Sequence, residues 1–271
     1  MDRVWRSKRG RFACVTLLLL IGLALIGPIL SQQTYYEINL ANKNAAPSLS
    51  HWFGTDELGR DFFTRCCFGI RISLFVGLSA ALLDLFIGIW YGAIAAAVGG
   101  AVEELMMRLV DIIETIPYLL LVALLIVVFG SGLFSIIFAL IATSWIPMAR
   151  IVRAEVLSLR ACDYLLASKT MGAGLLHQLK YHLIPGASGQ VIATMTLTVP
   201  LAIFTEAILS FLGLGVRVPI ASLGTLASDG ITVMRFYPLR LFLPALFISG
   251  AILSFNLLSD LISERSRHEP L

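Results

Sequence analysis

Long apolar stretches separated by short polar segments dominate the pattern of this chain. Six of them approach the length of about 20 residues that a helix needs to cross the hydrocarbon core of a membrane. They cover residues 12–31, 72–98, 112–130, 133–148, 190–214 and 239–261. None alternates strictly between apolar and polar residues, so the pattern predicts helices rather than the strands of a transmembrane barrel. We expect an all-α, polytopic transmembrane bundle of about six spanning helices.

The composition indicates the same class of protein. Hydrophobic residues make up 58% of the chain, charged residues make up 14%, and the mean hydropathy is +0.88. A chain of 271 residues with so few polar side chains cannot cover the surface of a water-soluble globule. We therefore expect lipid to surround much of the molecule.

The first apolar stretch follows a basic segment, as the core of a cleaved signal peptide would. This stretch is too long for a signal core, and Pro28, Tyr35 and Tyr36 follow without a small-x-small cleavage site. We interpret it as a retained first helix.

Basic residues are unevenly distributed among the polar segments. They concentrate in segments 1–11, 150–185 and 262–271, and they are sparser in segment 32–71. Because positive charges accumulate on the cytoplasmic side of a membrane, we expect both termini to be cytoplasmic. Segment 32–71 is then external, and residues 72–261 form a transmembrane core with segment 150–185 as a cytoplasmic loop.

The chain lacks the motifs of common catalytic and metal sites. No lysine follows a glycine, so the Gly-Lys-Ser/Thr step of a nucleotide-hydrolysing loop is absent. The histidines form no His-Glu-x-x-His pair, and no Gly-x-Ser-x-Gly elbow occurs. Cys66 and Cys67 are adjacent, which disfavours a disulfide between them. We predict no enzyme site, metal site or cofactor in this chain, and no nucleic-acid partner.

Segment 150–185 has the composition of two short helices joined by a bend. Asp163 can cap the first helix, and Gly172 and Gly174 permit a sharp turn. Pro185 is expected to mark the next helix boundary. A surface helix with small residues at its tip can lie in a groove on a soluble partner and pass movement to the bundle. An ordinary amphipathic loop explains these residues equally well.

This segment resembles the cytoplasmic signature loop of ABC importer permeases, with the pattern Glu-Ala-Ala-x3-Gly-x9-(apolar or His)-x-Leu-Pro. The spacing from Gly172 to Pro185 is intact, but Leu166 replaces the Glu and Ser168 replaces the second Ala. A polar contact between that Glu and the ATPase would therefore be missing. The resemblance implies an ATPase-coupling loop formed by Asp163, Tyr164, Leu166, Ala167, Ser168, Gly172 and Pro185.

Three further blocks, at residues 51–61, 209–215 and 255–260, resemble the dipeptide, oligopeptide and nickel group of these permeases. The first contains an external signature turn of Gly54, Thr55, Asp56, Gly59, Arg60 and Asp61. We favour a rigid structural role for this turn over direct contact with substrate. The chain departs from the usual pattern of this group at three places. Leu223 replaces a Trp, Ser259 replaces a Gly, and the Asp-Pro-Arg sequence that usually ends the pattern is absent.

Two carboxylates lie inside the apolar stretches. An ionised carboxylate is costly in a membrane, so Glu206, and with less weight Asp84, are candidates for the translocation path. A Glu that is protonated or paired with a neighbouring helix is the alternative. Gly88 and Gly92 form a Gly-x-x-x-Gly step that allows close helix packing, within this chain or with another subunit.

The resemblance implies the architecture of a type I ABC importer permease, in a bacterial inner membrane, of the second permease subunit type. It implies a homologous second permease, two cytoplasmic ATPase subunits that use ATP and Mg²⁺, and an external solute-binding protein. The expected cargo is a di- or oligopeptide, with nickel or another metal chelate as the alternative. An ion-driven secondary transporter or channel is the alternative from another class, which predicts broken helices or clustered carboxylates and no coupling loop.

Overall fold

A computed structural model of the chain describes residues 7–268. Within this range, the side chains of Leu166, Lys169 and residues 264–268 are not described. The described residues form helices and connecting segments, with one isolated antiparallel bridge between Thr55 and Asp61. The prediction of an all-α fold is thereby confirmed.

Five helices of the described part are long and apolar enough to cross a membrane, and a bent helix pair brings the number to six. The five are α2 (Lys8–Ser31), α3 (Phe62–Val98), α6 (Leu133–Leu159), α10 (Ser188–Phe211) and α12 (Leu239–His268). The bent pair is α4 (Gly100–Glu114) and α5 (Tyr118–Phe129). These numbers agree with the prediction of about six spans.

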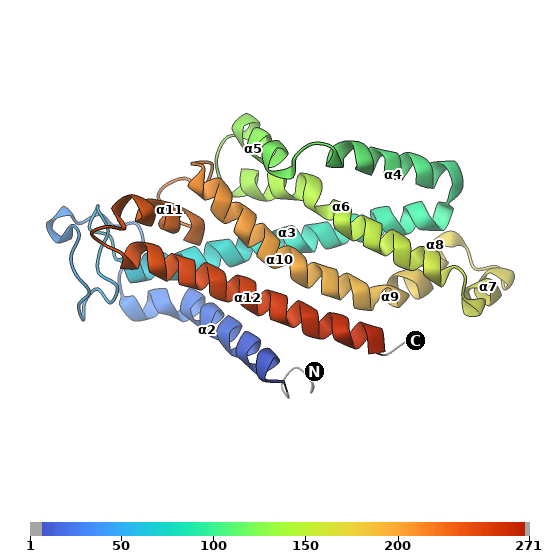
Figure 1. Cartoon of the computed structure of the whole chain (residues 1–271), viewed down its shortest axis with the longest axis horizontal. Coiled ribbons are helices and arrows are strands. Elements are labelled where there is room, and N and C mark those ends of the chain that lie inside the picture. Colours follow the sequence, from blue (N-terminus) through green and yellow to red (C-terminus); the bar gives the residue numbers. More distant parts are fainter. Residues whose placement is uncertain (1–6, 269–271) are drawn as a thin grey trace.

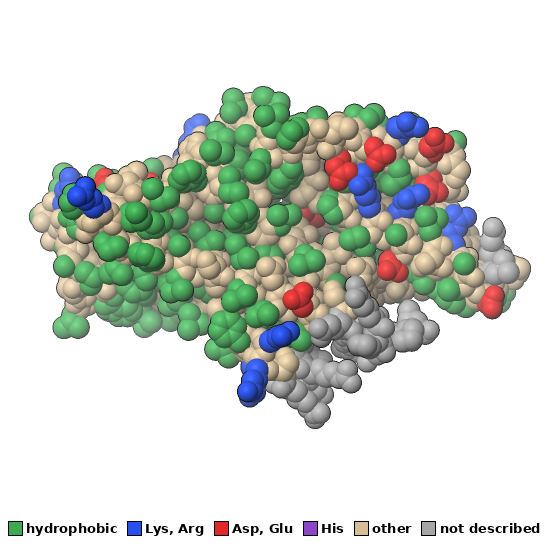
Figure 2. Space-filling view, viewed as in Figure 1, with side chains coloured by type: hydrophobic (Ala, Val, Ile, Leu, Met, Phe, Trp, Pro, Cys, Tyr) green, Lys and Arg blue, Asp and Glu red, His purple; other side chains and the backbone are tan. Residues whose placement is uncertain are grey.

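The five long helices run along the length of the molecule (Figure 1). Segment 32–61, with the short helix η1 (Leu40–Asn42), lies at one end together with α11 (Leu223–Val233). The short helices α7 (Asp163–Thr170) and α8 (Leu175–Gln178) lie at the opposite end. Hydrophobic side chains cover the middle of the face in Figure 2, whereas acidic and basic side chains gather over α4 and the adjacent part of α6.

The second spanning helix, α3, begins at Phe62, earlier than the apolar pattern predicts. Asp61 caps it, with Oδ2 accepting a hydrogen bond from the third residue of the helix at 2.8 Å. The sequence predicts an external segment up to residue 71, which includes Arg65 and Arg71. Inside the fold Arg65 forms an ion pair and Arg71 donates to a carbonyl of α2 at 2.7 Å, so both are compatible with a helix.

The third apolar stretch is not the single straight helix predicted for residues 112–130. The axes of α4 and α5 differ by 81° across the break at residues 115–117. Pro117 lacks an N–H and adopts an extended ψ of 121°, which ends the helical hydrogen bonding there. The hydropathy averaged along an apolar stretch does not reveal such a break.

The fourth helix, α6, continues to Leu159, whereas the sequence predicted a loop from Arg150 onward. The predicted loop contains basic residues, and two of these form ion pairs with acidic residues of α4. Arg150 lies 2.8 Å from Asp111, and Arg153 lies 2.6 Å from Glu103. Because α4 supplies these partners, the charges do not interrupt α6.

Pro185 lies inside a helical run rather than at a boundary. The run comprises α8, the π-helix η2 (Leu179–Leu183), α9 (Ile184–Gly186) and then α10. The Ile184 amide donates to the Leu179 carbonyl, which is the i to i+5 bond of a π-helix. This wider turn lets the chain continue although proline cannot donate a hydrogen bond.

Candidate functional site

The α7–α8 elbow consists of α7, the turn at residues 171–174 and α8. Gly172 has φ +88°, which favours glycine because a Cβ is strained in this conformation. The Ala173 amide donates to the Ser168 carbonyl at 3.1 Å, the bond of a Schellman motif that ends α7. Gly174 has φ −69° and needs no special residue. The predicted pair of short helices with a bend is therefore present, and Gly172 is the glycine that it requires.

Apolar side chains anchor the elbow to the bundle. Leu165 of α7 and Leu179 and Leu183 of η2 are buried in one cluster with residues of α3, α6 and α10. The partners in this cluster are Ala93, Ala96, Met148, Val152, Val156, Ala187 and Val191. These contacts attach the elbow to three spanning helices in a close-packed interior.

The outer surface of the elbow exposes large apolar side chains beyond the bundle. Met171 is 81% exposed and Leu176 is 75% exposed, and Tyr164 is also exposed. Exposed apolar groups gathered at the end of a bundle are typical of a surface that contacts another protein.

The predicted coupling residues divide into exposed and buried groups. Asp163, Ala167 and Pro185 are exposed, whereas Ser168 is buried. The side chain of Leu166 lies outside the described residues. The three anchoring leucines are not among the residues predicted from the sequence, although the spacing of Leu179 and Leu183 by one helical turn is a signal for a buried face.

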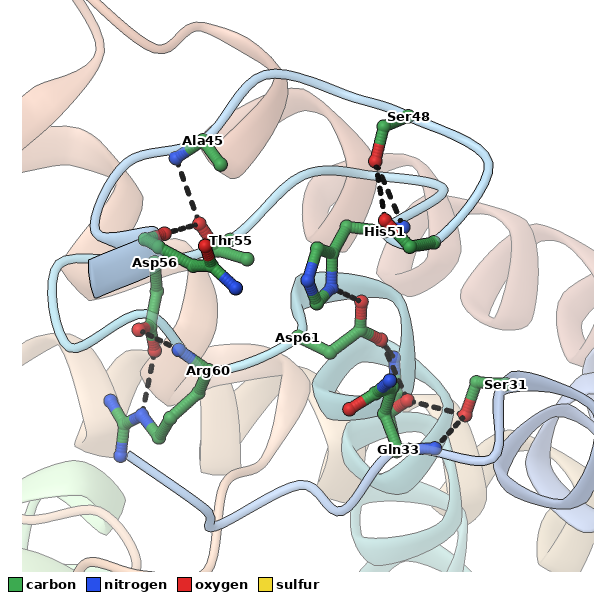
Figure 3. Close-up of polar contacts among 12 residues, drawn as sticks. Ser31, Gln33, Ala45, Ser48, His51, Thr55, Asp56, Arg60 and Asp61 are labelled. Carbon is green, nitrogen blue, oxygen red and sulfur yellow. Dashed lines mark hydrogen bonds and ion pairs between the residues drawn. The ribbon is translucent and has the colours of Figure 1, made fainter. Parts of the chain in front are cut away.

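At the opposite end, the signature turn is held by one buried carboxylate, Asp56 (Figure 3). Asp56 Oδ1 accepts from the amides of Leu58 and Arg60, each at 2.9 Å. Asp56 Oδ2 accepts from Arg60 Nε at 2.7 Å and from Arg65 Nη1. Both guanidinium groups are buried. Asp56 thus joins the turn to the first helical turn of α3.

The remaining turn residues bond to the surrounding loop. Asp61 Oδ1 lies 3.0 Å from His51 Nδ1, and Thr55 Oγ1 accepts from the Ala45 amide at 2.8 Å. A Cβ at Gly54, where φ is +75°, would lie 2.5 Å from a carbonyl oxygen. Arg240 Nη2 of α12 donates to the Thr55 carbonyl at 2.6 Å. The polar groups of the turn are engaged within the chain, an arrangement suited to a rigid structural element.

The electrostatics of this turn favour the ionised form of Asp56. Burial by itself raises the pKa of this carboxyl group. The positive charge of Arg65 opposes that effect, as do the hydrogen bond from the Arg60 amide and the charge of Arg60. The net result is a pKa below the ordinary value for aspartate.

Glu206, a candidate for the translocation path, is 0% exposed within α10. Its Oε1 accepts from Ser210 Oγ at 2.7 Å and its Oε2 from Ser73 Oγ of α3 at 3.2 Å. Ser73 Oγ in turn accepts from the Leu223 amide of α11 at 3.1 Å. In this conformation Glu206 links three helices and does not reach the surface of the chain.

Asp84, the second path candidate, is 0% exposed within α3. Its Oδ1 accepts from Ser144 Oγ of α6 at 2.6 Å, whereas its Oδ2 has no partner among the described residues. The two carboxylates contact different helices and belong to separate polar contacts. The structure therefore does not bring them together as one site.

Comparisons with known proteins place the chain among transport proteins. Residues 85–268 match the profile of the family described as "Binding-protein-dependent transport system inner membrane component". The chain is 50% identical over 262 residues to the oligopeptide transport system permease protein OppC of Bacillus subtilis, covering 96% of this chain and 86% of that protein. It is 48% identical over 259 residues to the dipeptide transport system permease protein DppC of the same organism, covering 95% of this chain and 81% of that protein.

More distant proteins share the fold. OppC of Escherichia coli is 38% identical over 267 residues, covering 95% of this chain and 88% of that protein. A solved structure titled "Crystal structure of an amino acid ABC transporter with histidines" matches with a TM-score of 0.54 at 19% identity. That match covers 73% of this chain and 92% of the solved chain, and it bears on the fold alone.

Proposed function

Because the chain belongs to the family of binding-protein-dependent transport system inner membrane components, we propose that it is a permease subunit of an ATP-driven importer of short peptides. The chain is a multi-pass membrane protein and a transport subunit. Two relatives, with 50% and 48% sequence identity to this chain, are named for oligopeptide and dipeptide transport, which supports peptides as the cargo. The observation that carries the proposal is the α7–α8 elbow, because a permease without an ATPase site needs a part that receives movement.

The complex contains this chain, a homologous second permease, two cytoplasmic ATPase subunits and an external solute-binding protein. The elbow end of the bundle is cytoplasmic, as are both termini, and the signature turn is external. ATP and Mg²⁺ bind to the ATPase subunits, which close on the exposed apolar surface of the elbow. The loaded binding protein delivers peptide at the other end, and ATP and the binding protein favour different conformations of the bundle.

Transport follows from the way in which the elbow is anchored. Leu165, Leu179 and Leu183 fix it to α3, α6 and α10. When the ATPase subunits close, the displaced elbow moves these helices and changes which side of the membrane the path faces. The motion is a rigid-body rearrangement of packed helices, because a close-packed interior resists continuous deformation.

Two alternatives differ in observable properties. A permease for nickel or another metal chelate shares the motifs, and a chelate needs no protein ligands to the metal. An ion-driven transporter predicts broken helices, and the 81° bend between α4 and α5 is such a break. That alternative does not account for the elbow or for membership in a binding-protein-dependent family.

Replacing Gly172 by alanine is expected to weaken coupling, because alanine at φ +88° is strained by about 1–2 kcal/mol. Gly174→Ala is the matched control, since an added Cβ would have no heavy atom within 4 Å at either glycine and φ at Gly174 is negative. The measurement is ATP hydrolysis by the reconstituted complex, with and without peptide-loaded binding protein. We expect stimulation to fall in Gly172→Ala only. Equal stimulation in both variants and the wild type would contradict a coupling role for the elbow.

A further inference from the structure

Ser168 departs from the alanine of the signature loop, and the structure gives its hydroxyl group a partner across the elbow. Ser168 Oγ of α7 lies 3.3 Å from His182 Nε2 of η2. Ser168 is 5% exposed and His182 is half-buried. A serine hydroxyl can donate or accept, so either tautomer of the imidazole satisfies this hydrogen bond.

The π-helix places His182 between the bundle and α7. Leu179 and Leu183 are each 1% exposed and pack into the cluster that anchors the elbow. His182, adjacent to Leu183 in the chain, is on the side of η2 that meets α7. Its ring centroid lies 6.1 Å from that of Tyr164, a second residue of α7. The bundle and α7 thus contact the same five-residue segment.

The described side chains of helix α7 make few other contacts with the rest of the chain. Among its described side chains, Leu165 and Ser168 are the buried ones. Leu165 contributes an apolar contact that holds α7 against the bundle, but such a contact is not directional and does not by itself set the orientation of α7. A hydrogen bond depends on distance and angle, so the contact with His182 fixes the orientation of α7 on η2.

We propose that Ser168 and His182 are positioning residues that form a polar tie across the elbow, so that a displacement of α7 is carried into η2 and the helical run leading to α10. This inference rests on the proposed coupling function of the elbow. The tie is intramolecular, and neither residue needs to contact an ATPase subunit or a peptide. It also gives the serine at this position of the loop a physical role.

The energetics of a partly buried hydrogen bond predict a distinctive pattern among variants. Removing one partner leaves the other with an unsatisfied polar group. The free-energy cost of that group exceeds the net contribution of the hydrogen bond to stability. Replacing both partners by apolar groups removes the polar requirement altogether and can be nearly neutral. Ser168→Ala and His182→Leu should therefore each be harmful, and the double variant should be less harmful than the sum of the two.

The test uses the complete complex in proteoliposomes, comparing wild type, S168A, H182L, the double variant S168A/H182L and H182N. The readouts are the ratio of hydrolysis rates with and without peptide-loaded binding protein, and amide hydrogen exchange in residues 163–170. The control is T170V, since Thr170 is an exposed residue of α7 whose hydroxyl donates to the Ala167 carbonyl of the same helix at 2.8 Å.

We expect each single variant to lower the stimulation ratio by about fivefold and to speed exchange in α7. H182N should recover much of both, since a carboxamide can bond with the Ser168 hydroxyl group. The double variant also lacks the tie, so it should lose no more stimulation than either single variant. T170V should resemble the wild type. The proposed tie would be overturned if the losses of stimulation in S168A and H182L added up in the double variant. It would also be overturned if both single variants were indistinguishable from T170V. If the wild type shows no stimulation by loaded binding protein, the proposed function fails, while the exchange data still decide whether the tie exists.

Discussion

Replacing Gly92 by valine is expected to separate α3 from α6 and to prevent stable folding of the chain. A Cβ at Gly92 would collide with the Ala149 carbonyl oxygen and lie 3.0 Å from its carbonyl carbon. These are backbone atoms of α6, so no side-chain rotation relieves the clash. One helical turn earlier, a Cβ at Gly88 would lie 2.6 Å from Met148 Cβ. The Gly-x-x-x-Gly step therefore serves helix packing within this chain.

Overpacking of this kind costs about 3 kcal/mol or more, because the larger valine branches meet the same backbone. The measurement is the yield and thermal unfolding of the purified chain in detergent. Gly22→Val is the matched control, since Gly22 lies in the spanning helix α2 and has no heavy atom within 4 Å of an added Cβ. An unfolding midpoint for Gly92→Val equal to that of Gly22→Val would contradict the close contact between α3 and α6.

Replacing Asp56 by alanine is expected to destabilise the signature turn by about 3–5 kcal/mol, because it leaves buried cations without their anion. Arg60 is 8% exposed and Arg65 is 4% exposed. Two amide hydrogen bonds to Asp56 Oδ1 are lost as well. Glu57→Ala is the control, since Glu57 is an exposed acidic residue in the same turn. Thermal unfolding and protease sensitivity of segment 32–61 measure the difference.

The pH dependence of a second variant, Asp56→Asn, provides an independent check. The folded-state pKa of Asp56 is lowered, so its contribution to stability is complete above the ordinary aspartate pKa of about 4. That contribution is lost as the pH falls further, through the lower folded-state pKa. The gap in stability between the wild type and Asp56→Asn should thus be constant from pH 5 to about pH 8 and narrow below about pH 4. A gap that widens on acidification would contradict an ionised, paired Asp56.

The apolar pattern of the sequence was enough to predict the class of fold, because each spanning helix needs a long run of apolar residues. It did not predict the ends of these helices. Arg65 lies inside a helix because Asp56 of the folded turn pairs with it, and Arg153 does so because Glu103 of another helix pairs with it. Such pairs depend on tertiary contacts, which a window of neighbouring residues does not contain. The break at Pro117 and the π-helix before Pro185 depend on residues close in the chain, but the hydropathy averaged along a stretch does not reveal them.

The elbow could be predicted from its glycines, because the requirement for positive φ at Gly172 is a property of the residue type. Its anchoring could not, since Leu165, Leu179 and Leu183 meet α3 and α6 only in three dimensions. The contact between Ser168 and His182 was hidden for the same reason.

The most direct test of the account is ATP-dependent uptake of a labelled short peptide by proteoliposomes that contain this chain, its partner permease and its ATPase subunits. The binding protein is supplied outside the vesicles and ATP inside, with an ionophore present to collapse ion gradients. We predict that peptide accumulates only when both ATP and the binding protein are present, and that a nickel chelate does not. Accumulation of the chelate instead, or peptide uptake that needs an ion gradient and no ATP, would contradict the account.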